Sequence, residues 1–104
     1  MSPTLETAEL DVFLYLQALH ERGGSDMFFS VGAPAHLKLE GASQAFDQRV
    51  LKQGEVQQLA YQLMSQKQIM EFERDLEMNL AVGVQNAGRF RVNVYYQRGQ
   101  VAMV

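Results

Sequence analysis

Residues 88–96 form the clearest strand pattern in the chain, and they read Gly88-Arg89-Phe90-Arg91-Val92-Asn93-Val94-Tyr95-Tyr96. Successive side chains of a strand point to opposite faces of a sheet. The polar face then carries Arg89, Arg91 and Asn93 with Tyr95, and the other face carries the apolar residues at 90, 92, 94 and 96. We therefore predict a strand that packs on one face and presents two guanidinium groups on the other.

The segments on either side of this strand predict a three-strand meander. Residues 79–84 are apolar and strand-like, and residues 85–88 form a loop before the arginine strand begins. After it, residues 97–100 are typical of a hairpin turn, and residues 101–104 begin a return strand. The chain stops inside that apolar strand without a polar tail, so we expect a fragment of a longer protein.

The N-terminal half predicts one helix followed by short strands. Apolar residues recur at helical spacing over residues 8–20, and Gly23-Gly24 ends the helix because glycine adopts a left-handed cap without steric cost. Strands are predicted at residues 27–31 and 35–40. Gly41-Ala42-Ser43 predicts a break, and residues 45–51 a further short strand.

Two more helices are predicted between these halves. Residues 55–64 place apolar side chains at helical spacing, and a second set follows at Ile69, Met70, Phe72 and Leu76. Ser65 precedes this second set, and its hydroxyl can accept a hydrogen bond from the first turn. The many glutamines in the region are compatible with helix.

Composition limits what the chain can do. Its 104 residues allow one domain, and 47% hydrophobic against 20% charged residues is ordinary for a globular protein. The lack of cysteine excludes disulfides, thiolate metal sites and a cysteine nucleophile. A net charge of −3 argues against non-specific nucleic-acid binding. With neither a signal peptide nor an apolar run of about 20 residues, we expect a cytoplasmic protein without membrane insertion.

Few residues carry an obvious catalytic or metal-binding motif. His20 and His36 lack partners at motif spacing, and the acidic residues 71–77 are more typical of a solvated helix face than of a calcium loop. No segment matches the phosphate-binding loop G-x-x-x-x-G-K-[ST]. We therefore predict no catalytic residue and no metal ligand in the chain.

The paired arginines are the strongest candidates for a binding role. Guanidinium groups are planar, permanently charged forks that suit phosphate or carboxylate oxygens. The alternative is that Arg89 and Arg91 form surface ion pairs with Glu71, Glu73 or Glu77, which are common and weak. The residues alone leave both interpretations open.

Four short motifs resemble, in order and spacing, the N-terminal domain of type IV pilus retraction ATPases, the PilT/PilU group of the secretion ATPase superfamily. They are Gly24-Ser25-Asp26-Met27, Gly32-x-Pro34 leading to Lys38-Leu39-Glu40-Gly41, Gly88-Arg89-Phe90-Arg91-Val92-Asn93, and Gln97-Arg98-Gly99. The resemblance covers nearly the whole chain. Phe28 stands where PilT-like members have histidine, and this departure favours the PilU side of the group.

The resemblance implies an α+β fold: a PAS-like antiparallel sheet with helices packed mainly on one face, filling residues 1–104 as one N-terminal domain. In the family this domain precedes a RecA-like ATPase core, which is absent from the chain. The core supplies the Walker motifs, so the isolated domain is expected to be neither an enzyme nor a cofactor-binding protein. ATP and magnesium belong to the full-length parent.

The resemblance also implies a role for three arginines. Arg91, Arg89 and Arg98 correspond to family arginines that reach the nucleotide phosphates between the two domains and couple hydrolysis to domain rotation. The implied partners are the chain's own ATPase core, five further copies in a hexamer, a PilT-like ATPase and the platform protein of the pilus machinery at the inner membrane. The alternatives are a free-standing PAS-like sensor of a small ligand and a protein-interaction adaptor.

Overall fold

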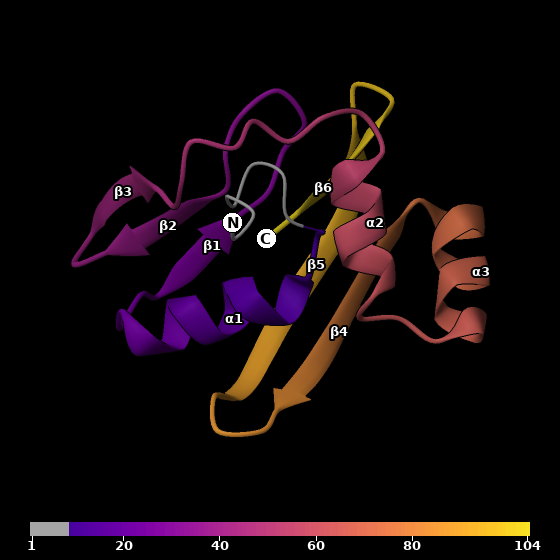
Figure 1. Cartoon of the computed structure of the whole chain (residues 1–104). Coiled ribbons are helices and arrows are strands. Elements are labelled where there is room, and N and C mark those ends of the chain that lie inside the picture. The colour runs from indigo at the N-terminus through magenta and orange to yellow at the C-terminus, as the bar shows by residue number, and fades with distance from the viewer. Residues whose placement is uncertain (1–8) are drawn as a thin grey trace.

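The structure is a computed structural model that describes residues 9–104 (Figure 1). The predicted lead-in and the first residue of the predicted N-terminal helix lie outside the described residues. The elements are α1 (Val12–Glu21), β1 (Asp26–Phe28), β2 (His36–Leu39), β3 (Ala42–Ala45), α2 (Glu55–Tyr61), α3 (Gln66–Asp75), β4 (Glu77–Val84), β5 (Gly88–Gln97) and β6 (Gln100–Met103).

The C-terminal meander has the predicted order β4-β5-β6, with both pairs antiparallel. Val92 and Val94 of β5 are buried, whereas Arg89 and Arg91 are exposed, so the predicted faces are confirmed. Arg98 and Gly99 form the turn to β6 with φ of 54° and 77°. Positive φ at both positions defines the type I′ turn, whose twist matches a two-residue hairpin.

The N-terminal strands form a second antiparallel sheet in the order β1-β2-β3. The strand predicted at residues 45–51 is wrong, because β3 occupies the predicted break instead. Glu40 and Gly41 make the turn, both with positive φ, and Leu39 pairs directly with Ala42. Every residue of β3 is exposed, so this edge strand carries no apolar alternation that a sequence pattern could detect.

Among residues 9–104, one pair of backbone hydrogen bonds joins the two sheets. Phe29 donates to the Met103 carbonyl at 2.8 Å, and Met103 donates back at 3.0 Å. This contact places β1 beside β6, so the strands run β3-β2-β1-β6-β5-β4 across the molecule. The α+β prediction is confirmed.

The helices cover the sheets mainly from one side. Figure 1 shows α1 and α2 in front of β5 and β6, with α3 beside β4. The core lies between these layers and is built from apolar residues of every layer: Val12, Tyr15, Leu19, Phe29, Leu37, Val56, Leu59, Phe72, Val94, Val101 and Met103.

Local signals define the helix ends. The Ser65 hydroxyl accepts from the Gln68 amide and the Gln68 side chain accepts from the Ser65 amide, so the predicted cap of α3 is confirmed as a capping box. After α1, Gly23 takes the left-handed conformation with φ of 69°. Gly24 is needed for a different reason, because a Cβ there would lie 2.6 Å from Leu19 Cδ1.

Candidate functional site

The N-terminal half of β5 has one open edge. β6 pairs with β5 only from Val94 to Gln97, and the backbones of Asn93 and Val104 add one more hydrogen-bonded pair at 2.8 and 2.9 Å. Within residues 9–104, no strand pairs with that edge of β5 before Asn93. The short β6 therefore leaves a groove between the start of β5 and β1.

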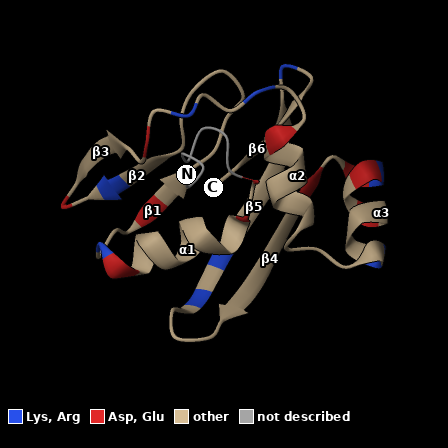
Figure 2. Ribbon diagram, viewed as in Figure 1, with Lys and Arg blue, Asp and Glu red and all other residues tan. Residues whose placement is uncertain are grey.

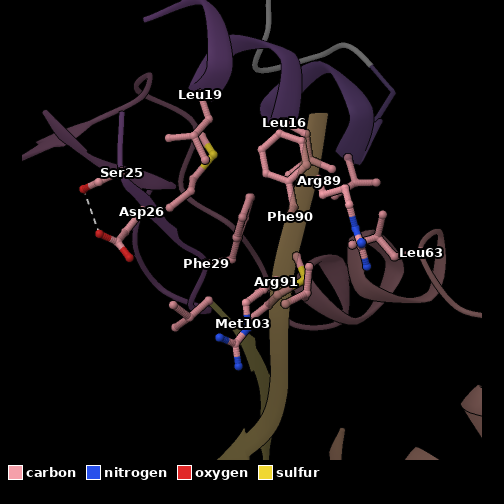
Figure 3. Close-up of a pocket in the computed structure, with 14 residues that line it drawn as sticks. Leu16, Leu19, Ser25, Asp26, Phe29, Leu63, Arg89, Phe90, Arg91 and Met103 are labelled. Carbon is pink, nitrogen blue, oxygen red and sulfur yellow. Dashed lines mark hydrogen bonds between the residues drawn. The ribbon is translucent and has the colours of Figure 1, made fainter. Parts of the chain in front are cut away.

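The groove has an apolar floor and a volume of about 360 Å³ (Figure 3). Leu16 and Leu19 of α1 cover it, Met27 and Phe29 line the β1 side, and Phe90 lines the β5 side. All of these except Phe90 are buried. The space therefore suits an apolar group.

Polar side chains stand at the rim of this groove. Figure 3 shows Ser25 and Asp26 on the β1 side, where the Ser25 hydroxyl donates to Asp26 Oδ2 at 2.8 Å. Arg89 and Arg91 line the β5 side. Figure 2 shows blue bands on β5 where the strand passes α1, and Arg89 and Arg91 are the basic residues of that strand. The rim thus carries two cations on one side and one carboxylate on the other.

The two arginines have room on the exposed face of the sheet. Gly83 lies opposite Arg89 and Ala81 lies opposite Arg91 on β4, so no bulky neighbour covers them from that strand. Among the described residues, neither arginine makes a hydrogen bond or an ion pair. Their donors are therefore available to an anion.

The ion pairs that the alternative interpretation requires are not found among the described residues. Glu73 instead accepts a hydrogen bond from the Tyr61 hydroxyl at 2.9 Å. Burial and this bond raise the pKa of Tyr61 to about 12. The ion pairs that the structure does show in residues 9–104 include Arg49–Glu55 and Arg74–Asp75.

Arg98 lies away from the other two candidates. It occupies the β5–β6 turn, whereas Arg89 and Arg91 lie near the start of β5, at the opposite end of the strand (Figure 2). Arg98 lies seven positions after Arg91, which corresponds to roughly 23 Å along a strand. The structure therefore brings Arg89 and Arg91 together and separates Arg98 from them.

Sequence reasoning assigned no site role to Asp26. Ser25 and Asp26 belong to a quoted motif, but only the fold shows that they line the same groove as Arg91. His36 Nδ1 lies 2.8 Å from the Pro34 carbonyl oxygen, a local contact within its own turn. Within residues 9–104, no group of three or more His, Asp or Glu side chains could hold a metal ion.

Comparison with known proteins finds relatives of this chain among type IV pilus ATPases. No protein-family model matches it. The type IV pilus ATPase PilU of Pseudomonas aeruginosa is 33% identical over 89 residues, which is 86% of this chain. The type IV pilus retraction ATPase PilT of the same organism is 31% identical over 88 residues.

The crystal structure of the pilus retraction motor PilT with bound ADP has 34% sequence identity and a TM-score of 0.83 over 91% of this chain. The chain is homologous to the N-terminal domain of PilT/PilU-type ATPases. The ATPase DotB of Legionella pneumophila shares the fold, with a TM-score of 0.76 at 19% identity.

This PilT/PilU-type domain spans about a quarter of its curated relatives, namely 23% of PilU and 26% of PilT. Among its described residues, no helix has the length and hydropathy that a membrane span requires.

Proposed function

We propose that this chain is the N-terminal coupling domain of a longer, hexameric ATPase that powers type IV pilus retraction and twitching motility. The support is its homology to PilU and PilT together with Arg89 and Arg91 on the exposed face of β5, whose guanidinium groups make no hydrogen bond or ion pair with residues 9–104. In this role the domain is not an ATPase by itself. A RecA-like core in the same protein supplies the catalytic motifs.

The proposed work of the domain is to bring Arg91 and Arg89 to the phosphates of a nucleotide bound between the two domains. Each guanidinium can bind two phosphate oxygens at once, and a pair on one face presents a local positive charge. Binding of these guanidinium groups to the phosphates would couple nucleotide binding to movement of the domain.

Arg98 is part of the same proposal, but it lies at the opposite end of β5 from Arg89 and Arg91. Because roughly 23 Å of strand separates it from Arg91, it would contact a different part of the neighbouring domain or subunit. The proposed partners are the ATPase core, the other copies of the hexamer, a PilT-like ATPase and the platform protein of the pilus machinery. ATP and magnesium act in the full-length parent, which would work in the cytoplasm at the inner membrane.

A second candidate function is a free-standing sensor of a small apolar ligand. The groove of about 360 Å³ under Leu16 and Leu19 favours it, because its floor is apolar and its rim is polar. A co-purified ligand that raises the melting temperature of the chain would support this function, since a ligand of the folded state stabilises it by mass action.

The test of the coupling function is ATP turnover by the full-length parent carrying Arg91→Ala. Arginines that face developing phosphate charge can contribute 10³-fold or more to phosphoryl transfer, so we expect turnover to fall at least about tenfold. Arg89→Ala should give a smaller loss in the same direction. Lys67→Ala, on the exposed surface of α3, is the matched loss of a cation and should leave turnover unchanged.

The fold of each variant is checked by its melting temperature. Unchanged ATP turnover in a folded Arg91→Ala protein would show that Arg91 has no role in the coupling. A loss of turnover in Arg98→Ala alone would assign the coupling to Arg98, at the opposite end of β5.

A further inference from the structure

β4 is an end strand of the six-strand array, and its outer side is unpaired. The array runs β3-β2-β1-β6-β5-β4, so β4 pairs with β5 on one side only. Within residues 9–104, no group forms a hydrogen bond with the outer side of β4. Figure 1 shows α3 beside the first part of β4, whereas the arrowhead end of the strand extends away from the helices. We name the outer side of residues 80–84 the β4 edge.

The backbone groups that point outward at the β4 edge follow from the strand register. The Asn93 backbone bonds to Val104 on the β6 side, so its cross-strand partner Asn79 makes no backbone bond to β5. Residues that bond to one neighbouring strand alternate with those that bond to the other. The N–H and C=O groups of Ala81 and Gly83 therefore point outward, like those of Asn79.

The β4 edge has none of the features that usually keep edge strands from pairing. Natural edge strands are commonly protected by lysine, proline, bulges or short length. Residues 80–84 contain no charged residue and no proline. β4 is eight residues long and pairs with β5 in unbroken register from Glu77 to Val84, so it has no bulge. The β4 edge can therefore accept another strand.

A strand added at the β4 edge would have two different faces. Ala81 and Gly83 lie on the exposed face of the sheet together with Arg89, whereas Leu80 and Val82 lie on the other face as half-buried apolar residues. Directly opposite residues of paired strands share a face. Alternate residues of the added strand would therefore lie on the arginine face, and the residues between them would cover apolar surface.

Arg89 is the cation closest to the β4 edge in the strand register. It lies directly opposite Gly83, which has no side chain to separate the guanidinium from the edge. An added residue beside Gly83 would lie two strand spacings from Arg89, roughly 10 Å between Cα atoms, which an arginine and a glutamate can span together. Figure 3 shows Arg91 pointing toward the side of Asp26 and Arg89 pointing away from it. Arg89 is therefore the better placed of the two arginines to bind a carboxylate at this edge.

We propose that the β4 edge binds an extended segment of a partner protein in which carboxylate and apolar side chains alternate. The backbone of that segment pairs with Ala81 and Gly83, and its carboxylate beside Gly83 binds Arg89. Its apolar side chains cover Val82 on the other face. This inference goes beyond the proposed function, because it requires neither a nucleotide nor the ATPase core. If both functions hold, phosphate and carboxylate compete for Arg89.

The charges on β4 favour an acidic partner over a second copy of the chain. Glu77 lies on the arginine face at the start of β4, so it repels a carboxylate there and favours binding at the far half of the strand. Antiparallel pairing of two copies about Ala81 would place Asn79 beside Gly83. Such a pair brings no carboxylate next to Gly83, where Arg89 could bind it.

The first test measures backbone pairing by amide hydrogen exchange of the 104-residue chain. The probe is a nine-residue peptide of alternating valine and glutamate with blocked ends. With the peptide at about ten times its dissociation constant, exchange at the Ala81 and Gly83 amides should slow about tenfold. Leu80 and Val82 are internal controls, because their amides bond to β5 and should be protected with or without the peptide.

The second test measures the contact with Arg89 by titration of the same peptide. Arg89→Ala should weaken binding about fivefold, and so should replacement of the peptide's glutamates by glutamine. The two changes together should cost no more than either one, because each removes the same contact. Lys52→Ala, the loss of an exposed cation before α2, should leave the affinity unchanged.

Unchanged exchange at Ala81 and Gly83 in the presence of the peptide would overturn the proposal. Equal affinities for the glutamate and glutamine peptides would also overturn it, because the carboxylate would then make no contact. Protection that grows with protein concentration and needs no peptide would instead assign the β4 edge to a second copy. Neither test contains ATP, so failure here is distinguishable from failure of the turnover test.

Discussion

At the scale of single residues, Glu55 binds the segment that leads into α2. Gly54 precedes α2 in a left-handed conformation and offers no side chain to the helix start. Glu55 Oε1 accepts from the Lys52 amide at 2.7 Å, and Oε2 accepts from Arg49 Nη2 at 2.8 Å. The hydrogen bond from Lys52 lowers the pKa of Glu55, and the bond and charge of Arg49 add to that effect.

Because the pKa of Glu55 is lower in the folded state, its charge stabilises the fold above the ordinary value of 4.5. That stability is lost as the pH falls from this value through the lower folded pKa. Glu55→Gln keeps the shape of the side chain and removes the charge. We expect it to lower the free energy of unfolding by about 1 kcal/mol at neutral pH. Urea unfolding at pH 7 and near pH 3 should show the difference only at the higher pH.

Glu21→Gln is the matched control, because Glu21 is exposed at the end of α1 and surface changes of this kind stay within about 0.5 kcal/mol. An equal loss for Glu55→Gln at both pH values would show that packing, and not the charge, carries the effect.

The sequence predicts which face of a sheet a side chain takes where a strand alternates in polarity. It does not predict which distant residue that side chain lies near. The alternation of β5 predicts which side Arg89 and Arg91 take, because it depends only on neighbours in sequence. That Asp26 and Arg91 line one groove depends on Phe29 meeting Met103, a contact between distant parts of the chain. No local spacing contains that information.

At the scale of elements, one glutamine connects α1 to α2. Gln62 Nε2 donates to the Leu10 carbonyl at 2.9 Å, and Gln62 Oε1 accepts from the Val12 amide at 2.7 Å. The first turn of α1 would otherwise leave that amide without a partner. Gln62 therefore ties the end of one helix to the start of another.

We expect Gln62→Ala to lower the free energy of unfolding by about 1–3 kcal/mol, because both partners are partly buried backbone groups. Gln58→Ala removes the same side chain from an exposed position of α2 and should cost less than about 0.5 kcal/mol. Chemical unfolding of the two variants gives the comparison. Equal stabilities would show that the bridge contributes nothing.

Element prediction succeeded where an element buries one face and failed where it does not. All three helices and the meander have an apolar face that meets the core, so their periodicity appears in the sequence. β3 is an exposed edge that is held by backbone hydrogen bonds and by the Glu40–Gly41 turn. Backbone pairing of this kind depends little on side-chain type, so a pattern of side chains could not locate it.

At the scale of the molecule, the proposed site is only half present. Arg89 and Arg91 are exposed, and salt screens exposed charges strongly. We therefore expect titration calorimetry of the 104-residue chain with ATP and magnesium to show no binding at a dissociation constant of about 1 µM or tighter. A tight complex would mean that the domain carries a complete nucleotide site, and would contradict the coupling function as proposed.

The backbone pairing of Phe29 with Met103 also affects how the chain folds during synthesis. Each sheet forms from strands that are neighbours in sequence, and such local pairings close quickly. The junction needs two segments from opposite ends of the domain, so its loop-closure entropy delays it. During synthesis the edge of β1 that pairs with β6 stays unpaired until β6 has left the ribosome. A chain arrested before Met103 would expose that edge, and such an intermediate is the form most prone to aggregate.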